Sequence, residues 1–302
     1  MKIRLLTVWL GLFNLLVGLN PAWGANFDAE RAWQHLIAQC EIGPRPPGSD
    51  AHRECLKYLE AELLKVCPDV SRQEFLGMNP KTKETLRLTN LVANFQPDRK
   101  RRVILGAHWD TRPWADQDSD RNQHKIPIIG ANDGASGVAV LLEIGRVISI
   151  NDPGIGVDIV LFDGEDMGRS GNLHEYCLGS RWYAENIAYP LPEAMILLDM
   201  VGDEDLRIPE ELYSRLSSPD LLNEIFGIAE MIGEAAFDPQ PGSAVYDDHV
   251  PFIELGIPAV DLIDFDYPYW HTIQDTPEHC SKSSLASVGR VVLEWLYQRG
   301  SR

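Results

Sequence analysis

Short apolar stretches recur along the chain, and most of them have the length and composition of β-strands. They are rich in Val, Ile, Leu and Phe, and turn-forming residues bound them, as is usual for strands. Several longer stretches between them repeat apolar residues every three or four positions, which is typical of helices. We therefore expect strands at 70–75, 85–95, 101–108, 156–163, 194–201 and 258–265, and helices at 27–40, 50–66, 134–149, 178–188 and 284–298.

The alternation of strands with helices predicts an α/β fold. Its core would be a mixed but mostly parallel central sheet, flanked by helices on both faces. No low-complexity linker or internal repeat divides the 302 residues, so we expect one domain from residue 25 to 302. In open sheets of this kind, ligands bind beyond the carboxyl ends of the strands.

Side chains that can bind a metal or move a proton gather at these expected strand ends. A histidine and an aspartate each end a strand, and an acidic pair follows a third strand. Another aspartate stands before a helix, and a second histidine comes shortly after the last strand. These candidates are His108, Asp133, Glu165, Asp166, Asp199 and His271.

Each candidate also has an ordinary structural explanation. Taken alone, Asp133 would most simply be a helix N-cap. Asp199 alone could be a solvated turn residue, and His271 alone a surface histidine. As a set, however, two imidazoles and several carboxylates at strand ends match the ligands of zinc hydrolases, which coordinate the metal through nitrogen and oxygen.

The N-terminus has the composition of an export signal. Lys2 and Arg4 precede a long apolar run, and Ala22 and Gly24 occupy the small positions before an expected cleavage site. We expect residues 1–24 to be a signal peptide, with an uncleaved membrane anchor as the alternative. The mature protein would then be exported, either to a periplasm or to the medium.

The charge of the chain excludes some partners. It carries 27 Lys and Arg against 45 Asp and Glu, a formal charge of −18, and loss of the two basic residues within 1–24 would make this −20. Such a surface repels phosphate backbones and anionic lipid headgroups. We therefore expect neither nucleic acid nor a membrane, apart from the signal segment, as a partner.

The five cysteines do not indicate a disulfide pattern. They cannot all pair within one chain, and none has the CxxC spacing of metal or redox motifs. Export would permit one or two disulfides, and buried free thiols are equally compatible with the sequence.

The order of the candidate residues resembles a known family. The motifs "HWD", "NDGASG", "GED", "LLDMVG" and "WHTIQDT" are similar to the successive metal-site motifs of the M28 zinc aminopeptidase superfamily, and most similar to its glutaminyl cyclase branch. The resemblance covers nearly the whole chain after the N-terminal segment. It implies a zinc aminopeptidase-like fold and an enzyme that converts the N-terminal Gln of peptides or proteins to pyroglutamate and releases ammonia.

Two branches of the superfamily use these positions differently. The resemblance to cyclases implies one Zn²⁺ on Asp133, Asp166 and His271. The resemblance to aminopeptidases implies a second Zn²⁺ that adds His108 and Asp199 as ligands. The neighbouring "PYWHT" and "YDDHVPF" favour the cyclase, and a two-zinc aminopeptidase is the alternative.

The cyclase resemblance also implies roles for other residues. Glu165, Asp199 and Asp247 would be catalytic, with Glu165 as the general base and the two aspartates hydrogen-bonded to each other. We expect a monomer that acts on peptides or proteins with N-terminal Gln. The substrate pocket would be lined by Trp109, Trp270, Tyr267 and His249, whereas Trp182 and Trp295 would be core residues.

Two departures from the cyclase pattern affect the site. The second acid of the usual Glu-Glu pair is Asp166, which is shorter by one methylene group. The segment "RSGNLHEYC" lacks the tryptophan that cyclases commonly have there and offers His174 and Tyr176. A non-catalytic M28-like binding protein is a third hypothesis, which the complete set of ligands and base disfavours.

Overall fold

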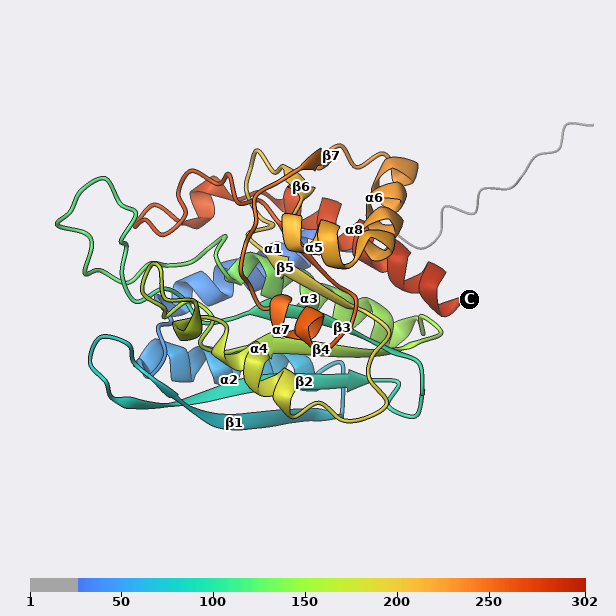
Figure 1. Ribbon diagram of the computed structural model, residues 1–302, viewed down its shortest axis with the longest axis horizontal. Coiled ribbons are helices and arrows are strands. Elements are labelled where there is room, and N and C mark those ends of the chain that lie inside the picture. Colours follow the sequence, from blue (N-terminus) through green and yellow to red (C-terminus); the bar gives the residue numbers. More distant parts are fainter. Residues whose placement is uncertain (1–26) are drawn as a thin grey trace, which may run out of the picture.

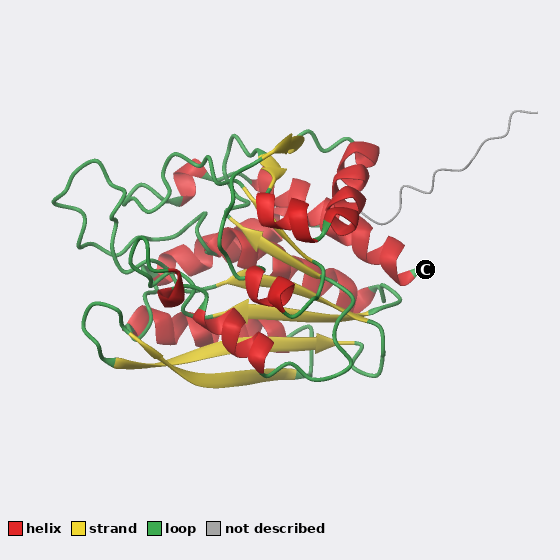
Figure 2. Ribbon diagram, viewed as in Figure 1, coloured by secondary structure: helices red, strands yellow, loops and turns green. Residues whose placement is uncertain are grey.

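The computed structural model describes residues 27–302, so the expected signal segment lies outside the described residues. Helices pack on both sides of a central sheet (Figures 1 and 2). The strands of this sheet are β1 (Val70–Met78), β2 (Thr85–Phe95), β3 (Arg102–His108), β4 (Gly156–Phe162), β5 (Met195–Asp199) and β8 (Ala259–Ile263). The α-helices are α1 (Ala29–Ile42), α2 (Asp50–Leu64), α3 (Ala135–Ile150), α4 (Leu178–Glu185), α5 (Leu212–Ser217), α6 (Pro219–Ile232), α7 (Val250–Glu254) and α8 (Lys282–Gly300).

The sheet is mixed and mostly parallel, as the sequence predicts. Its strand order is β1-β2-β4-β3-β5-β8, in which β4, β3, β5 and β8 run parallel to one another. Strand β2 is antiparallel to both β1 and β4. The carboxyl ends of the four parallel strands therefore lie at one edge, and the predicted α/β fold class is confirmed.

Each face of the sheet has its own hydrophobic core. Because successive strand residues point to opposite faces, Val103 and Leu105 of β3 pack with α1, α2, α3 and α8, whereas Ile104 faces the other side. There it packs with Phe252 of α7 and Tyr183 of α4. Helix α3 is buried along nearly its whole length, which explains its continuous apolar sequence.

Side-chain caps set several helix boundaries. Asp28 accepts hydrogen bonds from the first turn of α1, Ser49 accepts one from His52 in α2, and Ser281 accepts one from Ser284 in α8. Such caps satisfy backbone N–H groups that have no partner within the helix. The five predicted helices and six predicted strands are all present, with ends shifted by a few residues.

Several elements between residues 203 and 257 were not expected from the sequence. They are α5, α6, α7 and a small parallel sheet of β6 (Ile208–Glu210) and β7 (Phe237–Pro241). The described residues also form two 3₁₀ turns, η2 (Leu173–Glu175) and η3 (Pro277–His279). The five cysteines are free thiols, four of them buried. Within 27–302, none of the helices combines the length and apolar character that crossing a membrane requires.

Candidate functional site

Three parallel strands deliver polar side chains to one place. His108 is the last residue of β3, and Asp199 is the last residue of β5. Strand β4 ends at Phe162, and the turn that follows carries Glu165 and Asp166. The convergence follows from topology, because adjacent parallel strands end at the same edge of the sheet.

Asp133, Asp166 and His271 form a first group of residues that could hold a metal ion. Their candidate ligand atoms all lie within 4.8 Å of one another, and all three residues are buried. His271 Nε2 is 3.2 Å from Asp166 Oδ1 and 3.5 Å from Asp133 Oδ2. Asp166 Oδ2 is buried and has no hydrogen-bond partner. A buried, unpartnered carboxylate oxygen beside an imidazole and a second carboxylate fits Zn²⁺, which takes these donors.

His108, Asp133 and Asp199 form the second group. His108 Nε2 lies 3.1 Å from both Asp133 Oδ1 and Asp199 Oδ1, and its hydrogen bond is to Asp199. Asp133 thus belongs to both groups, with one oxygen toward each histidine. A Cβ at the next residue, Gly134, would come within 2.5 Å of the His108 ring, so the close approach requires glycine here.

Asp133 does not cap the helix that follows it. The N-cap of α3 is Gly134, and no side chain makes a cap hydrogen bond. The carboxylate oxygens of Asp133 instead face His108 and His271. The simple structural explanation of this residue therefore does not apply.

Two further aspartates hold the backbone of the loops that carry the groups. Asp110 accepts hydrogen bonds from the backbone N–H of Glu165 (3.1 Å) and of Asp166 (3.3 Å). Asp275 accepts from the backbone N–H of Asn132 (2.8 Å) and of Asp133 (3.2 Å). Both carboxylates are completely buried. Each loop is thus held by an aspartate that closely follows a site histidine in the sequence: Asp110 follows His108, and Asp275 follows His271.

A buried arginine also contacts the first group. Arg112 Nη1 donates to Asp166 Oδ1 at 2.8 Å, and its other nitrogens donate to both oxygens of Asp116. Burial raises the pKa of Asp166, but His271 and Arg112 outweigh this effect and lower it to about 2. Asp166 is therefore held as a carboxylate. Sequence reasoning missed Arg112, although the residue follows "HWDT" directly.

Glu165 lies beside the first group and remains half-buried. Burial, followed by the neighbouring Asp166 carboxylate, raises its pKa well above the ordinary value. Its Oε1 also accepts a long hydrogen bond from the Cys177 thiol, at 3.6 Å. A raised carboxyl pKa suits a group that must accept and return a proton near neutral pH.

Asp247 lies close to Glu165 and Cys177. Burial, followed by the Asp199 carboxylate, raises the pKa of Asp247 well above its ordinary value. Asp199 and Asp247, both among the described residues, do not form the expected hydrogen bond with each other. Asp199 Oδ1 instead lies 3.1 Å from His108 Nε2. The next residue, Asp248, accepts from the Ser180 hydroxyl at 2.5 Å.

A cavity of about 200 Å³ opens beside these residues. Trp270 lines it and stacks on the His271 ring, with 3.8 Å between ring centroids. Sequence reasoning named few of the other wall residues, because they come from loops that meet only in the fold. The lining includes Leu173, Tyr176, Val245, Tyr246, Ile263 and Phe265 together with Asp133, Glu165, Asp166, Asp199, Asp247 and His271.

The other three residues expected in the pocket lie elsewhere. Trp109 is fully buried and donates to the backbone carbonyl of Thr89, because it points to the face of the sheet opposite His108. Tyr267 is buried and its hydroxyl donates to Asp275. His249 is fully buried, with Nε2 3.3 Å from a carboxylate oxygen of Glu211. These three side chains do not line the cavity.

The comparisons with known proteins agree with this geometry. Residues 90–296 match the model of peptidase family M28. The glutaminyl-peptide cyclotransferase of Bos taurus is 25% identical over 88% of this chain and 82% of its own length. A crystal structure of Bacteroides thetaiotaomicron glutaminyl cyclase bound to N-acetylhistamine is 36% identical, with a TM-score of 0.87 over 90% of this chain and 98% of that one.

A solved structure described as an exopeptidase is equally similar. The Zn-dependent exopeptidase of Parabacteroides distasonis is 35% identical, with a TM-score of 0.87 over 91% of this chain and 99% of that chain. The family model covers the strands and loops that carry both ligand groups, from β2 to α8. On this evidence the chain belongs to peptidase family M28.

Proposed function

We propose that this protein is a zinc-dependent glutaminyl-peptide cyclotransferase, an acyltransferase that converts the N-terminal Gln of peptides or proteins to pyroglutamate and releases ammonia. The observation that carries this proposal is the position of Glu165, a half-buried residue with a raised pKa. It lies beside the group that contains Asp166, whose Oδ2 has no hydrogen-bond partner. The similarity to glutaminyl cyclases over nearly the whole chain supports the same activity.

One Zn²⁺ would be held by Asp133, Asp166 and His271. When bound there, it would act as a Lewis acid toward the γ-carbonyl of the substrate glutamine. The chemistry of the donors and the free Asp166 oxygen support this group as the metal site. Arg112 would orient Asp166 through its carboxylate, and Asp110 would do so through its backbone N–H. Hydrogen-bond partners of this kind orient the ligands at metal sites.

Glu165 would move the proton that the reaction requires. The α-amine of the substrate attacks the γ-amide carbon, which forms a C–N bond and closes a five-membered lactam. The C–NH₂ bond then breaks, and Glu165 passes the proton it took from the amine to the departing ammonia. A carboxyl group with a raised pKa suits both transfers.

Asp199 and Asp247 would orient the reacting nitrogen. Both line the cavity, and the two carboxylates are close enough for Asp199 to raise the pKa of Asp247. Like-charged neighbours resist double ionisation, so Asp247 would be protonated beside Asp199 and could offer a donor to the substrate amine, with Asp199 as an acceptor.

The cavity would act mainly by orientation. The nucleophile and the carbonyl belong to one residue, so the enzyme gains by holding them in an attack geometry and excluding water. Trp270, fixed by its stack on His271, would form one wall. Leu173 and Tyr176 would form another part of the wall. The cavity has a volume of about 200 Å³, which suits one small side chain and its backbone.

The cellular setting belongs to the same proposal. We infer an exported protein, periplasmic or secreted, with a signal peptide at 1–24 and a single catalytic domain at 25–302. Its charge and composition support peptides rather than nucleic acid as partners. We infer that it acts as a monomer.

A two-zinc aminopeptidase is the second candidate. It is favoured by the group His108, Asp133 and Asp199, whose ligand atoms also lie within 4.8 Å of one another. The similarity to a Zn-dependent exopeptidase supports it too. Against it stands the position of His108, which does not line the cavity and lies within hydrogen-bond distance of Asp199.

Peptides that differ only in their first residue separate these candidates. The zinc-loaded protein should release ammonia from a peptide that begins with Gln and leave an N-terminal pyroglutamate, detected by mass spectrometry. It should release no free amino acid from the same peptide beginning with Leu. Release of free leucine without pyroglutamate formation would contradict the cyclotransferase proposal.

A further inference from the structure

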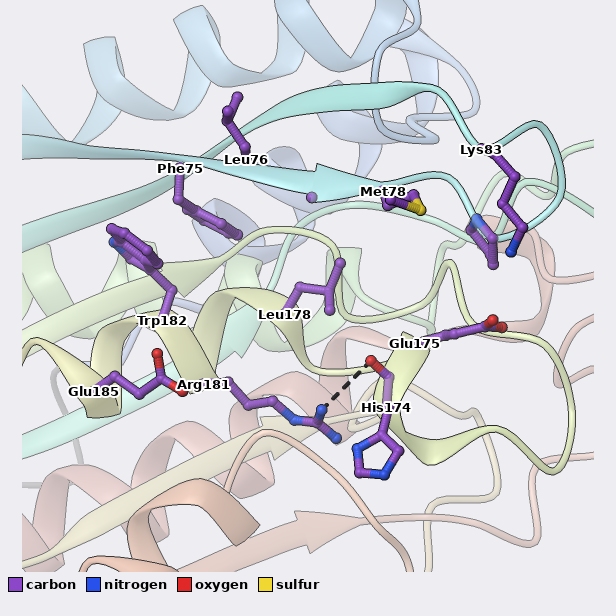
Figure 3. Close-up of a pocket in the computed structure, with 12 residues that line it drawn as sticks. Phe75, Leu76, Met78, Lys83, His174, Glu175, Leu178, Arg181, Trp182 and Glu185 are labelled. Carbon is purple, nitrogen blue, oxygen red and sulfur yellow. Dashed lines mark hydrogen bonds between the residues drawn. The ribbon is translucent and has the colours of Figure 1, made fainter.

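A second hollow lies near the catalytic cavity, between the end of β1 and helix α4. Its volume is about 310 Å³, and Figure 3 shows the side chains around it. Phe75 and Trp182 stack with 5.6 Å between their ring centroids and form one end of its floor, and Leu178 continues it. We call this hollow the β1–α4 groove.

Large apolar side chains of the groove are exposed to solvent. Trp182, expected from the sequence to be a core residue, is 38% exposed, and Met78 at the end of β1 is 57% exposed. Charged residues of both signs surround them, with Lys83 at one end and Glu185 at the other (Figure 3). Exposed apolar patches rimmed by polar residues commonly mark binding sites.

One short segment separates the groove from the catalytic cavity. Leu173 lines the cavity, whereas the next residue, His174, lines the groove. Arg181, a groove residue, donates to the Leu173 carbonyl at 2.7 Å and to the hydroxyl of Tyr246 at 2.9 Å. Since Tyr246 lines the cavity, the two hollows share a wall made of η2 and the Arg181 side chain.

We propose that the β1–α4 groove binds the part of a peptide substrate that follows its N-terminal glutamine, and that it selects an apolar or aromatic side chain there. This inference rests on the proposed function, which puts the first residue in the cavity. The wall that the two hollows share at η2 carries it, together with the exposed Trp182 that stacks on Phe75.

The position of the selected side chain follows from simple geometry. The wall at η2 is a single helical turn, and a helix with its side chains is about 10 Å across. An extended peptide advances about 3.3 Å per residue, so about three residues cross the wall. We therefore expect the selected side chain at about the fourth or fifth residue of the substrate.

A series of peptides tests the proposal. Each begins with Gln, continues with a run of Gly that lengthens by one residue at a time, and ends with Phe amide. The wild-type kcat/KM for pyroglutamate formation should rise about tenfold when Phe reaches the groove, a gain typical of one apolar side chain in a pocket. A kcat/KM that does not change along the series would overturn the proposal.

A matched pair of variants assigns the gain to the groove. Met78→Glu puts a charge on the groove, whereas Met231→Glu makes the same change on α6, far from β1 in the fold (Figure 1). The two methionines are similarly exposed, at 57% and 60%, so each substitution should be tolerated equally by the fold. Only Met78→Glu should abolish the rise, and both variants should turn over Gln-Gly amide at the wild-type rate.

Three results would contradict the proposal in different ways. If Met78→Glu kept the full rise, the groove would not be the binding site. If the wild type formed a dimer that Met78→Glu dissolved, the groove would bind a second copy of the chain. If no peptide formed pyroglutamate, the proposed function would itself fail, and this inference with it.

Discussion

The two groups of ligand residues share Asp133 but differ in how their polar atoms are satisfied. In the group with Asp166 and His271, a buried carboxylate oxygen has no partner, and the group borders the cavity. In the group with His108 and Asp199, the imidazole nitrogen lies 3.1 Å from two carboxylate oxygens, and His108 does not line the cavity. On the proposed function, the same residue types would form an ion site in one place and a hydrogen-bonded support in another.

The difference matters because counting ligands does not distinguish the two groups. Each contains carboxylates and one histidine, and each meets the same distance criterion. A buried polar atom without a partner is costly, so it indicates a missing ligand more strongly than a cluster of acids does. Variants of residues in and beside the two groups test this contrast, and Asp264 tests the effect of burial on a carboxyl group outside them.

The largest effect is expected at Glu165, which adjoins the first group without belonging to it. Glu165→Gln keeps the shape of the side chain but cannot accept a proton, so kcat should fall by about 10²–10⁴-fold. Zinc content, measured by mass spectrometry of the native protein, should stay unchanged. Undiminished turnover would transfer the role of base to another residue, of which Asp199 is the next candidate.

The two histidines should respond differently to removal. His271→Ala deletes a proposed ligand, so zinc affinity should fall by more than about 100-fold, beyond the 10–100-fold typical of supporting residues. His108→Ala should lower zinc affinity by less than about tenfold and reduce thermal stability instead, because two buried carboxylates lose their shared partner. Competition with a chelator measures both affinities. Equal losses in the two variants would remove the contrast.

Asp110 supports only the loop of the first group. Asp110→Asn replaces one acceptor oxygen by an amide group, so one of the N–H groups of Glu165 and Asp166 loses its partner. We expect a loss of about 1–3 kcal/mol in the free energy of unfolding, measured with denaturant. Zinc affinity should fall by about 10–100-fold, as for other residues that orient ligands. Unaltered affinity would mean that the loop keeps its shape without Asp110.

The smallest effect concerns Asp264, which lies outside both groups. Burial, opposed by the backbone hydrogen bond from Arg207, raises its pKa to about 6. Its protonated form is therefore favoured in the folded state, and folding stability should decline by about 1–2 kcal/mol as pH rises from about 4 to about 6. Asp264→Asn should flatten this part of the stability profile in denaturant titrations. A profile that remains as steep would assign the decline to other buried acids.

The sequence predicted the sheet and its polar edge well because both depend on local patterns. Strands such as β3 and β5 are continuous apolar runs that end at a polar residue, His108 or Asp199. Helix α6 could have been found, since Pro219 occupies its first turn and Gly233 its left-handed C-terminal end. Strand β6 has three residues, too few for a periodic signal.

The walls of the site were harder to predict, because most of their contacts join residues that are distant in the sequence. Only the orientation of Trp109 could have been inferred: strand residues alternate, so a His108 that points into the site implies that Trp109 points away. The position of His249 could not be inferred, because it lies 3.3 Å from Glu211, a residue that is distant in the sequence and close only in the fold. Likewise, Arg112 reaches Asp166 only after folding.

Titration of metal-free protein with Zn²⁺ tests the central claim most directly. Stripped protein should form no pyroglutamate from a peptide that begins with Gln, and activity should rise linearly and reach its plateau at one Zn²⁺ per chain. The group Asp133, Asp166 and His271 would then be sufficient to hold the working metal. A plateau at two Zn²⁺ per chain, with release of free amino acids, would contradict this account and identify the second group as a metal site.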